Sequence, residues 1–280
     1  MSLTQLILLA IVQGITEWLP ISSSAHLILL PELLGSGQQG LLIDAMAHLG
    51  TLGSLLIYFR KDVGRAIKGG FELIGIGKPD GPMSPAARLA WFIIIATPPG
   101  IVAGLALQMA PESLQTTLRS PLTIAFTSII FGLLLWWADV KGKRTRTQSD
   151  MTWRDAGLIG LSQMLPFIPG VSRSGITMTT SRMLGFERTE AARFAMLVGA
   201  PLIAGVGLYA FYGLATGDPA GASLKDGLIV AALSFVTGYV SIWGLMSLLK
   251  RMSFLPFVIY RVLLGLVILA TSPAILTLFS

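Results

Sequence analysis

Residues 13–26 read QGITEWLPISSSAH, and residues 163–175 read QMLPFIPGVSRSG. Each stretch joins a proline to a cluster of serines inside one of the most apolar parts of the chain. Each also carries side chains that are unfavourable in lipid: Glu17 and His26 in the first, and Arg173 in the second. Ionisable side chains at membrane depth are costly, mark functional sites by default and are expected to be partners of one another. We therefore expect the two stretches to build one site.

The composition is that of a membrane protein. Hydrophobic residues fill 53% of the 280 positions and charged residues only 12%, about half the charged share of soluble domains. Several apolar stretches are continuous over roughly the 20 residues that a transmembrane helix needs, which favours helices over a β-barrel. The N-terminus has no basic region before its first apolar run, so we expect no cleaved signal peptide. The absence of cysteine excludes disulfides and thiol chemistry.

The apolar pattern predicts an all-α polytopic protein with six full transmembrane helices, at residues 41–59, 87–109, 120–138, 190–216, 226–249 and 256–279. Regions 3–34 and 156–185 are broken by the Pro/Ser turns and predict two re-entrant helical hairpins. Basic residues gather in loops 60–88, 139–155 and 250–255, which the positive-inside rule places in the cytoplasm. The net charge of +6 therefore indicates membrane orientation and contact with lipids, not nucleic-acid binding. The charged turn around residues 182–193 is expected to be solvated.

The chain is expected to form a single membrane domain, 1–280, built from two repeats. The first, 1–138, has the hairpin 3–34 and three spans, and the second, 156–280, has the hairpin 156–185 and three spans. At an offset of 150, Ser22 and Ser24 correspond to Ser172 and Ser174. Three spans are an odd number, so the second copy is predicted to be inverted, as in proteins with a central polar site. The alternative is chance similarity between apolar helices.

The two turns together offer an anion site. A proline followed by serines suits a helix N-terminus, whose free N–H groups and dipole attract anions. Arg173 between serines can bind a phosphate or diphosphate bidentately. The predicted substrate-binding residues are Ser22, Ser24, Ser172, Ser174, Gln13 and Thr177. The alternatives are that Arg173 is only a counter-ion for Glu17, that each serine is a plain cap, and that Thr177 bonds its own helix.

Glu17 and His26 are the predicted acid–base pair. If Ser23 opens a helix, His26 follows three residues later on the same face, and Glu17 can orient it, act as the base or bind a divalent cation. Gln13, one turn before Glu17, is the second metal candidate. Three nucleophiles stay open: Ser23 activated by a base, His26 itself, or a water. His48 and Asp44 rank lower, because a satisfied bond between helices explains them equally well.

At these residues the chain resembles the undecaprenyl-diphosphate phosphatase family, which is associated with bacitracin resistance. The family's first motif corresponds to Gln13-x-x-x-Glu17 and the run from Ser22 to His26. Its second motif, Pro-Gly-x-Ser-Arg-Ser-x-x-Thr, is intact at residues 169–177. Two departures are Gln13, where many members have Glu, and Ala25, where Gly is common. The first weakens the expectation of a second acidic metal ligand.

The resemblance implies an enzyme that hydrolyses undecaprenyl diphosphate to undecaprenyl phosphate and phosphate, and so recycles the lipid carrier of cell-wall synthesis. It implies a bacterial plasma (inner) membrane location, a site towards the outer or periplasmic face, and assistance from Mg²⁺ or Ca²⁺. The implied roles are catalysis by Glu17 and His26, Ser23 as candidate nucleophile, and Arg173 with Ser172 and Ser174 on the diphosphate. Whether the chain forms a homodimer stays open.

The main alternative is a lipid-carrier flippase or transporter, because opposed broken helices in inverted repeats also build transporters. A carrier, however, needs few binding residues and not a carboxylate, an imidazole, a serine and an arginine together. A phosphatase of the phosphatidic-acid phosphatase class is excluded. That class requires a histidine after its arginine motif, and the only histidines here are His26 and His48.

Overall fold

The structure is a computed structural model that describes residues 2–33, 35, 40–216 and 223–271. The described residues form α-helices and short 3₁₀ helices, with no strand beyond one isolated bridge. In chain order they are α1 (Leu3–Trp18), α2 (Ser23–Leu33), α3 (Leu41–Tyr58), α4 (Arg60–Leu73), α5 (Pro85–Ala96), α6 (Pro98–Gln108), α7 (Glu112–Leu118), α8 (Pro121–Lys141), η1 (Gln148–Asp150), α9 (Trp153–Ser162), η2 (Leu165–Phe167), α10 (Arg173–Met183), α11 (Arg188–Thr216), α12 (Leu224–Leu249) and α13 (Leu255–Thr271).

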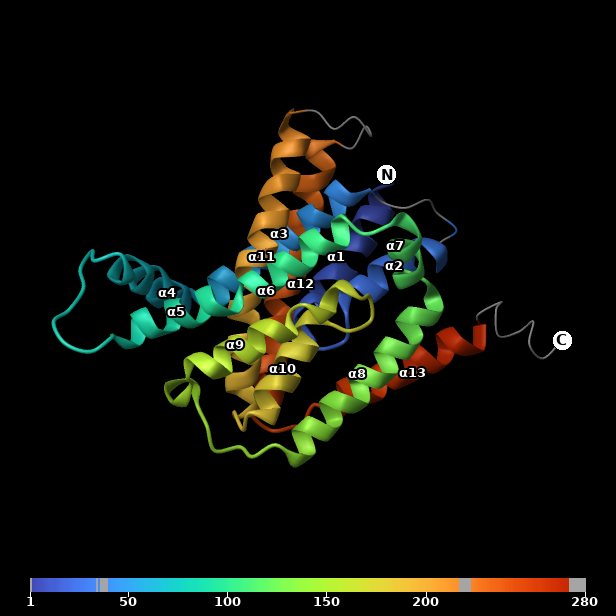
Figure 1. Cartoon of the computed structure of the whole chain (residues 1–280). Coiled ribbons are helices and arrows are strands. Elements are labelled where there is room, and N and C mark those ends of the chain that lie inside the picture. The colour runs from blue at the N-terminus through green and yellow to red at the C-terminus, as the bar shows by residue number, and fades with distance from the viewer. Residues whose placement is uncertain (1, 34, 36–39, 217–222, 272–280) are drawn as a thin grey trace.

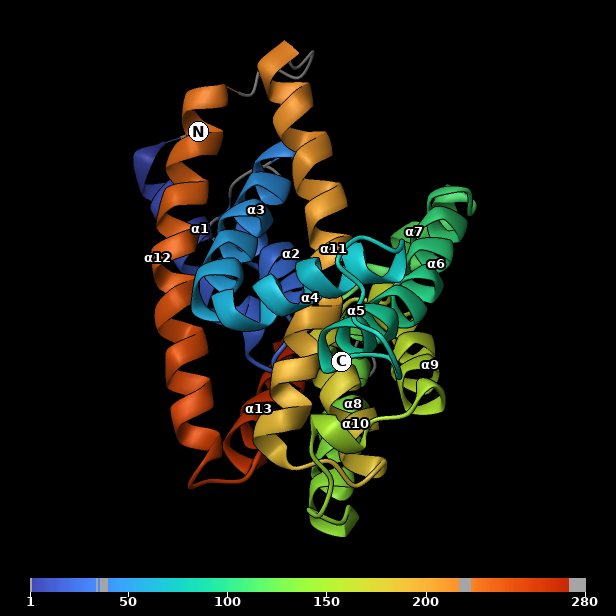
Figure 2. The same cartoon turned by 90° about the vertical axis from the view of Figure 1, so that its left-hand side faces the viewer.

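Five segments are long and apolar enough to cross a membrane: Leu41–Tyr58, Pro85–Gln108, Pro121–Lys141, Arg188–Thr216 and Leu224–Leu249. They match five of the six predicted spans. The two longest, α11 and α12, stand on either side of α3 (Figure 2). The span predicted at 256–279 begins as α13, whose 17 described residues are apolar but shorter than a full span. Residues 272–280 lie outside the described residues. The chain is thus a multi-pass membrane protein.

Close packing against α12 sets the positions of α1 and α3 relative to each other. A Cβ at Gly50 of α3 would lie 2.1 Å from the Ala231 carbonyl oxygen, and one at Gly14 of α1 would lie 1.8 Å from Thr237 Oγ1. Any larger residue at these two positions would clash with α12. Small residues are common where transmembrane helices pack closely. Because α1 and α3 both pack against α12, the C-terminal end of α1 lies beside the middle of α3.

Both Pro/Ser turns break the helices as the sequence predicts. Helix α1 ends at Trp18, two residues before Pro20, and α2 begins at Ser23. In the second region α9 ends at Ser162 and α10 begins at Arg173, with η2 between them. Ser22 and Ser172, 150 residues apart, are the only non-glycine residues of the described chain with positive φ, at 74° and 69°. This strained conformation persists only where the surroundings enforce it, and it clusters at functional sites.

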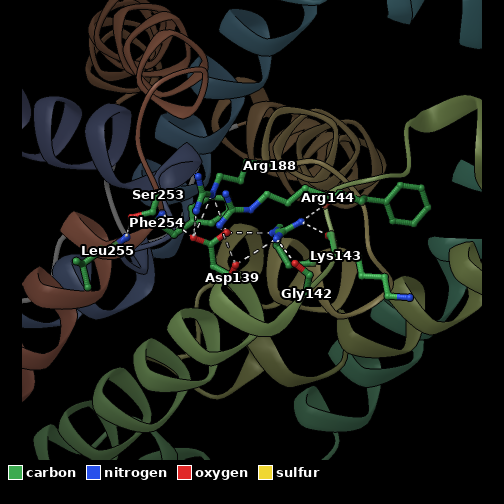
Figure 3. A network of polar contacts seen from close by, with 10 residues as sticks. Asp139, Gly142, Lys143, Arg144, Arg188, Ser253, Phe254 and Leu255 are labelled. Carbon is green, nitrogen blue, oxygen red and sulfur yellow. Dashed lines mark hydrogen bonds and ion pairs between the residues drawn. The ribbon is translucent and has the colours of Figure 1, made fainter.

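The turn predicted to be solvated around residues 182–193 is in part a buried ionic anchor (Figure 3). The prediction is wrong for Arg182, while Glu187 is exposed as expected. Arg182 is fully buried, and its Nε donates to Oδ1 of Asp139 at 3.0 Å. Arg188 adds a two-pronged contact with the same carboxylate at 2.8 Å and 2.8 Å, and the Phe254 N–H donates to it at 3.3 Å. Asp139 therefore joins α8, α10, α11 and the turn before α13.

The loop predicted at 60–88 contains α4, a helix that the sequence analysis missed. Helix α4 and the first turns of α5 form an arm at the left of Figure 1. Ile67 and Phe71 of α4 are 58% and 50% exposed. The basic Lys61, Arg65 and Lys68 lie to one side of these two residues on the helix. Such an amphipathic helix is suited to lie in the membrane interface.

Candidate functional site

The two broken regions meet. Ser174 at the start of α10 donates its hydroxyl to the carbonyl oxygens of Leu19 at 3.0 Å and Glu17 at 3.3 Å, both in the first break. The fully buried guanidinium of Arg261 donates to Pro20 O at 3.4 Å, Gly170 O at 2.8 Å and Val171 O at 3.0 Å. Arg261 thus joins the two breaks by donating to backbone carbonyl oxygens of both. Nothing in its sequence context marked it.

The serines of the two breaks form matching hydroxyl pairs. Ser22 Oγ lies 3.2 Å from Ser24 Oγ, and Ser172 Oγ lies 3.2 Å from Ser174 Oγ. Ser172 also caps α10, because its hydroxyl accepts from the Gly175 N–H at 3.1 Å. The pairing agrees with the sequence correspondence at an offset of 150.

Glu17 is a buried carboxylate with three polar side chains around it. It is 6% exposed, and its Oε2 accepts from Ser23 Oγ at 2.6 Å and from Gln13 Nε2 at 3.0 Å. His48 Nε2 lies 3.4 Å from the same oxygen. The predicted Ser23, Glu17 and Gln13 are therefore in direct contact, and His48, which ranked low in the sequence, joins them. A serine hydroxyl within hydrogen-bond reach of a carboxylate is a standard nucleophile–base arrangement.

His48 lies between Asp44 and Glu17. Its Nδ1 lies 2.8 Å from the carbonyl oxygen of Asp44. A carbonyl oxygen only accepts, so Nδ1 carries a hydrogen and neutral His48 would present a lone pair at Nε2. That lone pair faces a carboxylate oxygen of Glu17. An imidazole nitrogen facing a carboxylate can pass a proton to it or take one from it, which makes Glu17 and His48 a candidate acid–base pair.

His26 does not contact Glu17. Among the described residues its Nδ1 pairs with the Ser22 carbonyl at 2.7 Å, and its Nε2 lies 2.5 Å from the hydroxyl of Tyr260. The two rings stack with centroids 5.7 Å apart. Tyr260 is 42% exposed, so His26 faces the outer surface of the bundle through this tyrosine. The predicted direct Glu17–His26 pair is absent from the contacts of the described residues, because α2 turns His26 towards α13.

Arg173 is half-buried at the start of α10. The only hydrogen bond of its guanidinium within the described part of the chain is to the Gly199 carbonyl, at 3.5 Å. No carboxylate of that part lies within 4.0 Å of it, although Glu17 is close enough to interact with it electrostatically. Thr177 is fully buried and donates to Arg173 O at 2.7 Å, in agreement with the alternative that it bonds its own helix.

The oxygens around Glu17 fit a hard cation in part. The Oε1 of Gln13 is buried with no partner, and the Oε1 of Glu17 accepts no hydrogen bond from the described residues. Mg²⁺ and Ca²⁺ prefer oxygen ligands, and Mg²⁺ commonly uses one or two protein groups together with substrate phosphates. The described residues contain no cluster of three or more acidic or histidine ligands. The donor set therefore suits a cation that is completed by a substrate.

Comparisons with known proteins agree with this site. The family model described as bacitracin resistance protein BacA matches residues 6–267. An undecaprenyl-diphosphatase of Hyphomonas neptunium is 56% identical over 98% of both chains. Relatives with the same name in Maricaulis maris and Jannaschia sp. are 50% and 48% identical, over 96% and 98% of this chain and 98% and 100% of their own. The chain belongs to the bacitracin resistance protein BacA family.

Proposed function

We propose that the chain is an integral membrane phosphatase that hydrolyses undecaprenyl diphosphate to undecaprenyl phosphate and phosphate. This reaction recycles the lipid carrier for peptidoglycan synthesis and gives bacitracin resistance. The family membership and the undecaprenyl-diphosphatase relatives support it. The observation that carries it is the contact of Ser23 with Glu17 beside Arg173, at the meeting point of two helix breaks.

The diphosphate binds between the breaks. Arg173 has no carboxylate within 4.0 Å in the described chain, and the backbone N–H groups of Arg173 and Ser174 donate to no other described group. Such donors at a helix N-terminus are suited to phosphate oxygens. Ser22, Ser24 and Ser172 supply further hydroxyl donors. The isoprenoid tail then leaves sideways into lipid, past the exposed ring of Tyr260.

Ser23 is the nucleophile that the geometry favours among the three candidates. Its oxygen attacks the terminal phosphorus, and the bond from that phosphorus to the bridging oxygen breaks, releasing undecaprenyl phosphate. The Ser23 proton passes to the pair of Glu17 and His48 and from it to the departing undecaprenyl phosphate. The same pair then takes a proton from a water, which attacks the phosphorus on the serine, and Ser23 Oγ takes up that proton as phosphate leaves. When substrate binds, Nε2 of His26 leaves the hydroxyl of Tyr260 and pairs with a phosphate oxygen instead. Phosphoryl transfer needs mainly such positioning and charge stabilisation.

A divalent cation would be held by the oxygens of Gln13 and Glu17 together with the substrate. When bound, it would supply charge neutralisation on the diphosphate. The matching positive-φ serines and hydroxyl pairs support two inverted repeats, 1–138 and 156–280, with the hairpins re-entrant. The basic loops support a plasma-membrane orientation with the site open to the outer face. A homodimer remains compatible with this arrangement.

The test is phosphate release from undecaprenyl diphosphate by the purified full chain in detergent. We expect Arg173→Ala to lose at least 100-fold in turnover, in line with the loss of one transition-state donor. Arg154→Ala is the matched control, because Arg154 is exposed and packs only on Trp153. Near-normal activity of Arg173→Ala would refute the proposal. Movement of the lipid between vesicle leaflets without phosphate release would favour the flippase alternative.

A further inference from the structure

A charged cavity that contains none of the candidate catalytic residues lies where α3 ends and α4 begins. It has a volume of about 750 Å³ and is lined by the charged residues Arg60, Lys61, Asp62, Arg65, Lys68 and Arg193. Five of these are basic and one is acidic. The cavity is at the base of the arm formed by α4 and α5 in Figure 1. Nothing in the phosphatase mechanism uses it.

The cavity keeps positive charge that the protein does not neutralise. Its one carboxylate, Asp62, is buried and accepts from Arg65 and Arg193 together. Arg60 and Lys61 have no ion-pair partner within 4.0 Å among the described residues. Cations gathered in a cavity attract an anion, and the absence of protein acceptors for these two leaves them available to one.

Apolar surface surrounds the cavity. Leu56 and Ile57 of α3 are 39% and 51% exposed, next to the cavity-lining Tyr58. Ile67 and Phe71 of α4 are exposed as well. In a multi-pass protein such residues face hydrocarbon, so the cations lie at the level where hydrocarbon meets the lipid head groups. A ligand that fits both features has an anionic phosphate and apolar chains.

We propose that this cavity binds an anionic phospholipid of the inner leaflet. The phosphate lies near Arg60 and Lys61, and the acyl chains lie along the exposed apolar faces of α3 and α4. Basic pockets on the cytoplasmic side of membrane proteins recognise such head groups. The site goes beyond the phosphatase function, because its ligand is a structural lipid that is not hydrolysed. It would hold the arm of α4 and α5 on the membrane surface.

Two glycines of α4 provide a matched test. Gly64 lines the cavity and Gly70 does not, and a Cβ built at either position meets no atom within 4 Å. Glutamate is therefore tolerated at both, and only Gly64→Glu adds a negative charge to the cavity. The chain is purified in a zwitterionic detergent and titrated with phosphatidylglycerol, phosphatidylcholine or inorganic phosphate, and bound lipid is counted by native mass spectrometry.

We expect the unchanged chain to bind phosphatidylglycerol at least tenfold more tightly than phosphatidylcholine. Gly64→Glu should weaken this binding roughly fivefold, and the double variant Arg60→Gln with Lys61→Gln roughly 30-fold, by the contribution of each charge near a lipid surface. Gly70→Glu should bind like the unchanged chain. All variants should keep phosphate release, which separates this proposal from the catalytic one. Equal weakening in both glutamate variants, no lipid preference, or binding of inorganic phosphate as tight as that of the lipid would overturn it.

Discussion

The contact between Glu17 and His48 predicts how substitutions at the two positions combine. Opposite charges 3.4 Å apart attract by about 5 kcal/mol at an effective dielectric constant near 20, before the cost of desolvation. Measured couplings between contacting residues are smaller, about 0.5–3 kcal/mol. We therefore expect Glu17→Gln, His48→Gln and the double variant to show a coupling of about 1–3 kcal/mol in kcat/KM, or roughly 5–150-fold.

The assay is phosphate release with purified chains whose unfolding temperatures match. His48→Gln is the informative single variant, because the amide can donate to Glu17 but cannot take up a proton. His48→Ala removes both capacities. If the pair transfers a proton during the reaction, Glu17→Gln and His48→Gln should each lose about 10²–10⁴-fold in turnover, the range of general acid–base catalysis. Full activity in His48→Gln, or additive losses in the double variant, would show that His48 contributes only a hydrogen bond or nothing.

Three other perturbations test separate parts of the structure. Asp139→Asn leaves the buried Arg182 without its carboxylate and should cost about 3–5 kcal/mol of stability. An unfolding temperature in detergent that decreases by less than a few degrees would contradict this. Burial raises the pKa of the Asp155 carboxyl, but the hydrogen bonds from Arg146 and Thr152 outweigh it and hold this pKa below its ordinary value. Its stabilising contribution is therefore complete above about pH 4 and is lost as the pH falls through the lower folded-state value, and unfolding scans of Asp155→Asn should lack this acid-side loss. Tyr260→Phe frees His26 Nε2 and should lower KM with little change in kcat; a large fall in kcat would instead make Tyr260 part of the chemistry.

The sequence predicted the helix breaks because their cause is local. A proline and a following serine cluster end one helix and start another whatever surrounds them, so Pro20, Ser23 and Arg173 lie where the pattern indicated. Five spans were predictable because continuous apolar stretches of sufficient length have few alternatives in a membrane. Ser23 was one of three candidate nucleophiles in the sequence, and the structure places its hydroxyl against Glu17.

The identity of the histidine beside Glu17 was not predictable in this way. His26 is nearer in sequence, but the entry angle of α2 turns it to Tyr260. His48 reaches Glu17 because α1 and α3 both pack closely on α12 through Gly14 and Gly50. Such a contact depends on three helices that are distant in the chain. The buried Arg261 was missed for the same reason.

The composition of the charged segments was a poorer guide to their structure than the spacing of their residues. Residues 60–73 are rich in Lys and Arg, which suggested a loop, yet Ile67 and Phe71 recur at helical spacing on an amphipathic α4. Arg182 resembled an interfacial residue until its partner Asp139, 43 positions earlier, was known. The helical spacing of Ile67 and Phe71 is visible in the sequence, whereas the partner of Arg182 is visible only in the structure.

Turnover of Ser23→Ala tests the central claim most directly. If two opposed breaks hold a diphosphate against a serine activated by Glu17, the purified and folded variant should release phosphate at least 10³-fold more slowly than the unchanged chain, as in other enzymes that lose their nucleophile. Its affinity for undecaprenyl diphosphate should be largely retained, because Arg173 and the helix ends remain. A variant that keeps a tenth or more of the activity would contradict the account.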